Sequence, residues 1–254
     1  MHKSGFVNII GNPNVGKSTL MNALVGEKLS IITSKAQTTR HRIMGIVSGE
    51  DFQIVYSDTP GILKPSYKLQ ESMMKFVTGA VTDADVILYV TDTVEQGDRS
   101  AEIIGRIRES GIPTVVVINK IDLSTPEALD ALVDKWRQEL PEAQIVPASA
   151  KENFNIEGLF KTILALLPEG PAFYPKETLT DKTLRFFASE IIREKILKFY
   201  DKEIPYCCEI EIDSYREEPT IDRIAATIYV ARDSQKGILL SLIHISEPTR
   251  RVVI

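Results

Sequence analysis

The sequence predicts an α/β protein whose main domain is a mostly parallel, six-stranded sheet flanked by helices, followed by a smaller, incomplete α+β domain. Short apolar runs alternate with helical stretches over the first two-thirds of the 254 residues. A glycine-containing segment joins the first apolar run to the first helical stretch. Near Leu167 the alternation stops at a cluster of prolines. These three observations set the fold class and the domain order.

Composition excludes several other classes of protein. The chain is 43% hydrophobic and 26% charged, which is ordinary for a soluble globular protein. Its net charge of -5 argues against binding of nucleic acid through bulk positive charge, so any RNA contact must be local. The two cysteines, Cys207 and Cys208, are adjacent and cannot staple distant segments, which favours a reducing compartment. No stretch resembles a signal peptide or reaches membrane-spanning length.

The elements of the first domain follow from the apolar runs. Five β-rich runs are expected to form strands, at residues 6–10, 52–56, 86–90, 114–118 and 144–146. Helical stretches lie between them, for example at residues 17–25 and 126–139. The turn at residues 48–51 predicts that a further strand, 43–47, pairs with 52–56 as an antiparallel hairpin.

A change in amino-acid composition marks the domain boundary. Four residues there cannot continue a helix or pair in a central strand: Pro168, Gly170, Pro171 and Pro175. We therefore expect a first domain at 1–168, a linker at 169–176, an incomplete second domain at 177–238 and a tail at 239–254.

The second domain is predicted to contain a helix followed by a hairpin. Apolar residues recur at helical spacing from about residue 183 to residue 200. Two alternating segments, 208–213 and 224–230, follow and are separated by a turn at 217–219. The tail shows neither helical nor alternating order. It is either a divergent natural tail or, as we favour, unrelated sequence after a truncated reading frame.

A phosphate-binding motif follows the first apolar run. The motif G-x-x-x-x-G-K-S/T is matched by Gly11, Asn12, Pro13, Asn14, Val15, Gly16, Lys17 and Ser18, and Thr19 comes next. The glycines let backbone N–H groups converge on phosphate oxygens, and the helix N-terminus favours negative charge. Lys17 is expected to bridge the β- and γ-phosphates, and Ser18 to ligate Mg²⁺. This motif predicts a phosphate site without identifying the nucleotide.

The segment after the strand at 114–118 identifies the base. Asn119, Lys120 and Asp122 form the pattern Asn-Lys-x-Asp at the carboxyl end of that strand, where open α/β sheets bind ligands. The Asp122 carboxylate can accept from N1–H and the amino group of guanine, whereas adenine would leave it unpaired. Asn119 is expected to steady the loop and approach the 6-oxo group, and the Lys120 stem to cover the ring. Backbone N–H groups toward the base are expected from Ser149, Ala150 and Lys151.

Two segments between these anchors are predicted to sense the γ-phosphate. Asp58-Thr59-Pro60-Gly61 follows the strand at 52–56, which places Asp58 to hold the Mg²⁺ shell and the Gly61 N–H to reach the γ-phosphate. Upstream, Thr39 is expected to complete the Mg²⁺ shell. The predicted metal set is therefore Ser18, Thr39 and Asp58. The predicted catalytic set is Asn14, Lys17, Thr39 and Gly61, and Ile62 is added to the residues around GTP.

With these motifs located, the chain resembles the Era family of bacterial GTPases, in the TrmE-Era-EngA-like class, over about residues 3–238. The resemblance implies a P-loop GTPase domain that hydrolyses GTP to GDP and phosphate with Mg²⁺. It also implies a type II KH domain, of which residues 177–238 would be a part, that binds 16S rRNA during assembly of the small ribosomal subunit. A cytoplasmic location follows from it, with peripheral association at the inner face of the cell membrane as a further expectation.

The sequence departs from the motifs of related proteins in two places, and the first departure concerns the rate of GTP hydrolysis. GTPases of the Ras type place a water-orienting Gln after Asp-x-x-Gly, and Ile62 stands there instead, so unaided hydrolysis should be slow. The resemblance implies that Asn14 helps to hold a potassium ion in place of an arginine finger; alternatively Asn14 only shapes the loop.

The RNA-binding loop is the second departure. KH domains clamp RNA with a G-x-x-G loop, but Gly237 is the last glycine of the chain, which puts the RNA role in doubt. The helical segment at 182–202 is the only basic stretch of the second domain, and is either a solvated face or a phosphate contact.

Two other functions remain open from the sequence. A P-loop kinase of a small metabolite would need a substrate lid and would not need Asn-Lys-x-Asp. A nucleotide-binding fragment without an RNA function would retain the motifs and lack RNA affinity.

Overall fold

A computed structural model describes residues 1–254 except 36, 67, 95–100 and 246–254. The chain divides into two compact units, Met1–Asp181 and Lys182–Ile254, each with its own internal packing. The two units are described separately below.

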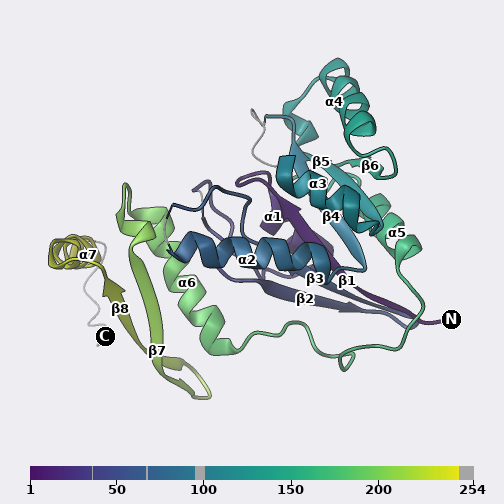
Figure 1. Ribbon diagram of the computed structural model, residues 1–254. Helices are drawn as coiled ribbons and strands as arrows, with labels where there is room; N and C mark the ends of the chain where they lie inside the picture. Colours follow the sequence, from purple (N-terminus) through teal and green to yellow (C-terminus); the bar gives the residue numbers. More distant parts are fainter. Residues whose placement is uncertain (36, 67, 95–100, 246–254) are drawn as a thin grey trace. The chain divides into compact units, whose positions relative to one another are not determined.

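The first unit is built on a six-stranded sheet with strand order β2-β3-β1-β4-β5-β6 (Figure 1). The strands are β1 (Lys3–Gly11), β2 (Ile43–Ser48), β3 (Phe52–Asp58), β4 (Val86–Asp92), β5 (Thr114–Asn119) and β6 (Gln144–Pro147). Only β2 runs antiparallel to its neighbour, β3, as the hairpin pattern predicts. The central strands β4 and β5 are buried along their whole length, because helices cover both faces of the sheet. The predicted mostly parallel, six-stranded architecture is confirmed.

The helices of this unit are α1 (Lys17–Val25), α2 (Lys68–Thr82), α3 (Ala101–Ser110), α4 (Pro126–Glu139) and α5 (Ile156–Leu166), with a short 3₁₀ turn, η1, at Ile121–Leu123. Apolar side chains of α2, α3 and α4 share one core cluster with β1, β4 and β5. Helix α1 packs on β3 and contacts α5. The sequence ranges expected for α1 and α4 coincide with the observed bounds.

The first unit extends past the expected boundary at residue 168. We call residues 169–181 the strap, because they lie along the β2–β3 side of the sheet. The side-chain oxygen of buried Gln53 accepts from the N–H groups of Phe173 (2.7 Å) and Tyr174 (2.9 Å). The Ile46 N–H donates to the Leu179 carbonyl at 2.8 Å. The prolines exclude regular structure here, as predicted, but they do not prevent the backbone from bonding to the sheet, so this segment is not a free linker.

The second unit has the predicted α+β order. Its elements are α6 (Leu184–Phe199), the 3₁₀ turn η2 (Ile204–Tyr206), β7 (Cys208–Glu217), β8 (Asp222–Val230) and α7 (Asp233–Ile245). Strands β7 and β8 form an antiparallel pair. A small core contains Ile196, Tyr200, Ile204, Cys208 and Leu239. The alternation expected along β7 is present, since Cys208 is buried and Glu209 is exposed.

The predicted tail is wrong at its beginning. Helix α7 continues through residue 239 to Ile245. Leu239 is only 5% exposed, and its carbonyl accepts from the Tyr200 hydroxyl at 2.7 Å. The packing of Leu239 with Tyr200 in one core therefore accompanies a helix that the irregular apolar pattern after Gly237 did not indicate. Residues 246–254 lie outside the part of the chain that is described.

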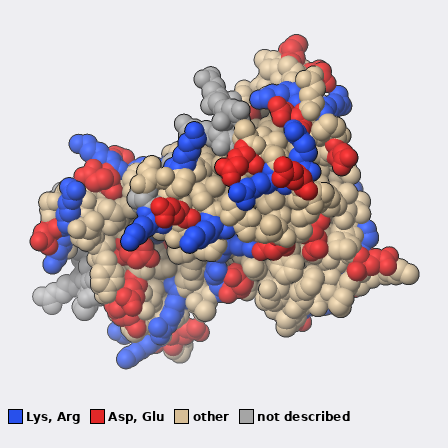
Figure 2. Space-filling model, in the orientation of Figure 1, with Lys and Arg blue, Asp and Glu red and all other residues tan. Residues whose placement is uncertain are grey.

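Basic and acidic residues are interspersed over the face of the molecule in Figure 2 and do not gather into one continuous patch. Within the described residues, we find no helix that combines the length and the apolar character needed to cross a membrane.

Candidate nucleotide-binding site

The phosphate loop connects β1 to α1 and depends on two glycines. Gly11 has a φ of 155°, and a Cβ atom there would lie 2.1 Å from the Val90 carbonyl oxygen. Gly16 has a φ of 94°, and a Cβ atom there would lie 2.3 Å from the Asn119 side-chain nitrogen. No side chain caps the N-terminus of α1 at Gly16, so its first N–H groups remain available to an anion. Both glycines of the motif are therefore required, because an added Cβ atom would clash at each position and the positive φ angles disfavour other residues.

Lys17 is held inside this loop. Its side chain is buried, and its ammonium group donates to the carbonyls of Gly11 (3.0 Å) and Asn12 (2.7 Å). Beside it lies a cavity of about 460 Å³, a size typical of small-molecule sites. The predicted residues that line this cavity are Pro13, Asn14, Gly16, Lys17, Ser18, Thr19, Thr39, Thr59, Gly61, Lys120 and Lys151. The phosphate loop, both γ-phosphate segments and the base loops therefore share one cavity.

The three residues predicted to hold Mg²⁺ meet at one point. The Ser18 hydroxyl donates to Asp58 Oδ2 at 2.7 Å and lies 3.0 Å from the Thr39 hydroxyl. The Thr39 hydroxyl lies 3.3 Å from the same Asp58 oxygen. These side chains come from α1, from the segment before β2 and from the end of β3.

The Asp58 carboxyl is buried, and its environment suits a cation. Burial raises the pKa of Asp58, and hydrogen bonds from hydroxyl groups such as that of Ser18, together with the nearby Lys17 ammonium, oppose this rise without cancelling it. Among the described residues, Asp58 Oδ1 has no hydrogen-bond partner. A buried carboxylate oxygen without a partner, beside two hydroxyl groups, fits the oxygen ligands that Mg²⁺ prefers.

Asn119 joins the phosphate loop to the base loops. Its side chain is buried, and the amide nitrogen donates to the Val15 carbonyl at 2.8 Å. The amide oxygen accepts from the Ala150 N–H at 3.0 Å. These two bonds connect the phosphate loop to the loop that contains Ala150, and the predicted approach of Asn119 to the guanine ring stays a prediction.

Asp122 is oriented by the hydroxyl group of Ser149, a residue for which the sequence predicted only a backbone N–H directed at the base. The Ser149 hydroxyl donates to Asp122 Oδ1 at 2.6 Å. The N–H groups of Ser149 and Ala150, expected to face the base, donate instead to the Phe154 carbonyl and to Asn119. A bridge between Ser149 and Phe154 closes the loop and takes up the first of these N–H groups. In this loop it is the Ser149 hydroxyl that contacts Asp122, while the N–H groups of Ser149 and Ala150 are bonded elsewhere.

Lys120 spans the two halves of the site. Its backbone is left-handed, with a φ of 59°, and its ammonium donates to the Asn14 carbonyl at 2.5 Å. It also donates to Asp92, a residue that the sequence analysis missed. The only signal in the sequence was that Asp92 follows the apolar run at 86–90; the register that pairs Asp92 with Asn119 is visible only in the structure.

The segment from Thr59 to Ile62 lies against the phosphate loop. The Thr59 hydroxyl donates to the Ile9 carbonyl at 2.7 Å, and a Cβ atom on Gly61 would lie 2.8 Å from Pro13 Cα. The Ile62 N–H donates to the Gly11 carbonyl, and its side chain is buried in the core with α2 and β1. The Ile62 side chain therefore does not face the nucleotide cavity, contrary to its inclusion among the GTP-binding residues.

Comparisons with known proteins agree with this geometry. A family model described as 50S ribosome-binding GTPase matches residues 6–120. GTPase Era of Staphylococcus haemolyticus (strain JCSC1435) is 42% identical over 241 residues, which cover 94% of this chain and 81% of the relative.

Two solved structures resemble this chain over most of its length. Era in complex with MgGDPNP and nucleotides 1506–1542 of 16S ribosomal RNA has 39% identity and a TM-score of 0.89, covering 94% of this chain and 82% of that one. An Aquifex aeolicus Era variant bound to GDP·AlF₄⁻ has 39% identity and a TM-score of 0.88, covering 93% and 82%.

Proposed function

Because this chain belongs to the Era family of GTPases, we propose that it is a GTP-hydrolysing switch that acts in assembly of the small ribosomal subunit. The observation that carries the proposal is the Asn119 side chain, which bonds to Val15 in the phosphate loop and to Ala150 in the base loop. One site thus recognises the phosphates and the guanine together. The matching family model names the 50S particle, whereas the relative that matches along the chain is bound to 16S RNA, and we follow the latter.

Nucleotide titration tests the base preference. We expect GDP and GTP to bind, and ATP to bind at least about a hundredfold more weakly, because adenine leaves the Asp122 carboxylate unpaired. Comparable affinities for ATP and GTP would contradict the proposal. A metabolite kinase, the alternative that the sequence left open, is not supported by the family assignment.

The residues present fit the hydrolysis of a magnesium-bound triphosphate. Ser18, Thr39 and Asp58 would hold Mg²⁺, which neutralises charge on the β- and γ-phosphate oxygens. The Lys17 ammonium is fixed by two carbonyl groups of the loop beside the cavity, where its charge would stabilise the phosphates. Gly61 lies against the phosphate loop at the cavity, and would offer its N–H to the γ-phosphate.

We propose that a potassium ion held by Asn14 assists this reaction. Asn14 is exposed at the cavity with a left-handed backbone (φ 66°), and its carbonyl is already bonded to Lys120. Turnover of GTP should be faster in potassium than in sodium buffer for the unchanged chain, and equally slow in both for Asn14→Ala. Equal turnover of the unchanged chain in the two buffers would exclude the cation role and leave Asn14 as a residue that shapes the loop.

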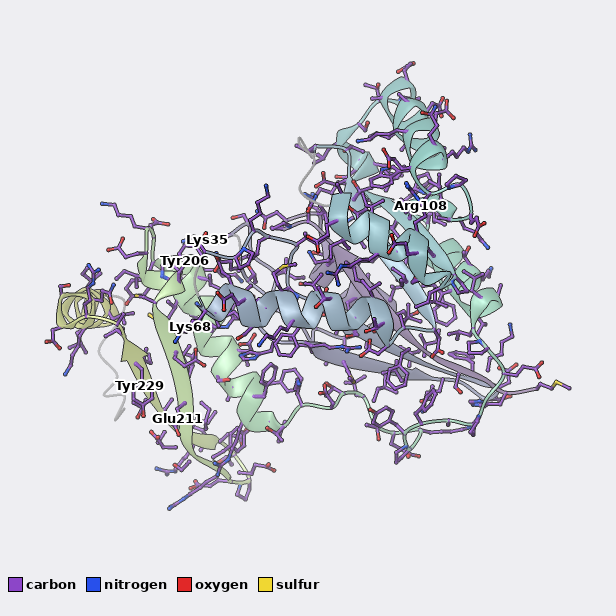
Figure 3. All side chains as sticks on the ribbon, viewed as in Figure 1. Lys35, Lys68, Arg108, Tyr206, Glu211 and Tyr229 are labelled. Atoms are coloured by element: carbon purple, nitrogen blue, oxygen red, sulfur yellow. The ribbon has the colours of Figure 1, made fainter. Side chains whose placement is uncertain are left out.

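The second unit would carry the RNA function, and its charges restrict where RNA binds. The exposed residues in the first half of β7 are acidic, namely Glu209, Glu211 and Asp213. Glu211 accepts from the Tyr229 hydroxyl at 2.9 Å (Figure 3), and Asp213 accepts from Thr227. This face repels phosphates. Exposed basic residues of α6, such as Arg185 and Lys195, are therefore the better candidates for phosphate contact.

RNA titration separates an active assembly factor from a nucleotide-binding fragment. Because Gly237 is the last glycine and α7 continues past it, we propose that this chain binds the RNA fragment 1506–1542 at least about tenfold more weakly than the Era protein of the solved RNA complex does. Both proteins are titrated at several salt concentrations, since phosphate contacts weaken with salt. Equal affinity would show that the RNA function does not need the G-x-x-G loop.

We further propose that the protein acts in the cytoplasm, where ribosomes are assembled, with a peripheral fraction at the inner face of the cell membrane. Cell fractionation tests this location. A salt wash should release all membrane-associated protein, and a fraction that resists the wash would contradict a peripheral association.

A further inference from the structure

Asp92 lies at the carboxyl edge of the sheet, beside the residues that bind the base. It is the last residue of β4, and in the parallel register its partner on β5 is Asn119. Its side chain is only 5% exposed. A buried carboxylate at this position needs a partner, and the structure supplies a charged one.

The partner is the Lys120 ammonium group. Lys120 Nζ donates to Asp92 Oδ2 at 2.6 Å. The other carboxylate oxygen accepts from the Val94 N–H at 3.0 Å, which fixes the orientation of the carboxylate. The Thr93 hydroxyl donates to the Lys120 carbonyl at 3.1 Å. The end of β4 thus holds both the backbone and the side-chain head of Lys120.

The same ammonium group reaches the phosphate loop. It donates to the Asn14 carbonyl at 2.5 Å, while the Lys120 side chain remains 30% exposed along its length. The head is therefore fixed at two points, and the aliphatic stem between head and backbone forms one wall of the site.

We infer that Asp92 is a positioning residue for nucleotide binding, which holds the Lys120 ammonium on the Asn14 carbonyl and so ties the base loop to the phosphate loop. This inference rests on the proposed binding of guanine nucleotide. A lysine side chain without such a partner samples many rotamers, and this freedom would be lost each time a nucleotide binds. Fixing the stem in advance should slow nucleotide release.

The test is a double-mutant cycle on release of GDP carrying a fluorescent group on the ribose. Asp92→Asn keeps the size of the side chain but turns an N–H donor toward the ammonium, so we expect release to be about tenfold faster. Lys120→Met should also speed release. In the Lys120→Met background, Asp92→Asn should have no further effect, because the group that Asp92 positions is already absent.

A purely structural role for Asp92 gives a different result. If Asp92 only caps the turn through Val94, the effects of Asp92→Asn and Lys120→Met on release will multiply, which would overturn the inference. Unchanged release from Asp92→Asn would overturn it equally. Weak GDP binding by the unchanged chain would instead count against the proposed function.

Two further variants distinguish the effect of the Asp92 charge from that of the neighbouring contact with the Lys120 backbone. Asp92→Ser can still accept from the Val94 N–H without a negative charge, and should release GDP as fast as Asp92→Asn does. Thr93→Val removes the neighbouring bond to the Lys120 carbonyl but leaves the ammonium fixed, and should change release by less than about threefold. A larger effect of Thr93→Val than of Asp92→Ser would show that the backbone, and not the charge, positions Lys120.

Discussion

Two constraints exclude a side chain at residue 16. The backbone there has a φ of 94°, and a Cβ atom would lie 2.3 Å from the Asn119 side chain. Gly16→Ala should therefore displace Asn119 from Val15 and abolish nucleotide binding measured by calorimetry. Gly26→Ala is a matched control, because Gly26 also has a positive φ (83°) but no atom within 4 Å of an added Cβ. That control should lower the melting temperature through backbone strain of about 1–2 kcal/mol and leave GDP affinity unchanged.

Asp58, a predicted metal ligand, is expected to lower the stability of the protein when nucleotide and metal are absent. Burial raises its folded-state pKa above the ordinary value of 3.8, so above pH 3.8 the folded protein binds more protons at this site than the unfolded chain does. Without nucleotide and metal, the contribution of Asp58 to the free energy of unfolding therefore falls as the pH rises through its folded-state pKa.

Asp58→Asn removes this unfavourable charge. At neutral pH the nucleotide-free variant should melt at a higher temperature than the unchanged chain, by about 2–4 °C for each kcal/mol that the substitution adds to the free energy of unfolding. The difference in melting temperature should shrink as the pH approaches 3.8. Magnesium-dependent GTP binding should fall in the same variant. A lower melting temperature of the variant at neutral pH would refute the assignment.

At the scale of elements, a polar network joins the segment before β2 to the end of α2. Arg42 donates to Ser57 (2.5 Å) and to Asn8 Oδ1 (3.0 Å), and pairs with Asp83 after α2. The Asn8 amide nitrogen donates to the Ala80 carbonyl at 2.8 Å. The network explains why a polar residue, Asn8, interrupts the otherwise apolar run of β1.

Arg42→Met should leave Asn8 Oδ1 without its charged donor, and we expect it to lower the free energy of unfolding by about 1–3 kcal/mol. Urea denaturation measures this change. Arg106→Met is the control, since Arg106 forms an exposed i,i+4 pair with Glu102 and should change stability by less than about 0.5 kcal/mol. Equal effects of the two substitutions would show that the network does not stabilise the fold.

Local signals made many of the elements predictable. Helix α1 ends where Gly26 adopts a left-handed conformation, and α4 starts at Pro126, after Thr125 accepts from the Ala128 N–H. Each boundary is set by neighbouring residues, so the sequence reveals it.

Contacts that depend on register were not predictable in this way. Asp92 reaches Lys120 only because β4 and β5 are aligned, and the Ser149 hydroxyl reaches Asp122 only because the loop closes on Phe154. The bonding of the strap to the sheet was not predicted for a related reason. Its prolines indicate only which regular structures it cannot form, whereas its hydrogen bonds to Gln53 depend on a residue more than a hundred positions away. Leu239 was missed because burial, and not periodicity, places it in a helix.

At the scale of the whole molecule, every residue predicted to bind nucleotide lies in the first unit, which has its own core. A chain that ends at Asp181 should therefore fold alone and hydrolyse GTP at a rate within about threefold of the full chain. A chain that ends at residue 168 lacks the strap.

The shorter chain should be the less stable of the two. Without Phe173 and Tyr174, the Gln53 side chain loses three hydrogen bonds to the strap, and its amide oxygen loses both of its donors, while the amide nitrogen keeps its bond to the Ser48 hydroxyl. At about 1 kcal/mol for each bond, its free energy of unfolding in urea should be lower by about 2–4 kcal/mol. Gln53→Met in the chain ending at Asp181 should reproduce much of this loss, because it removes the same bonds and leaves the strap present. If the two shortened chains unfold at the same urea concentration, the strap is a linker after all, and residue 168 is the boundary of the domain.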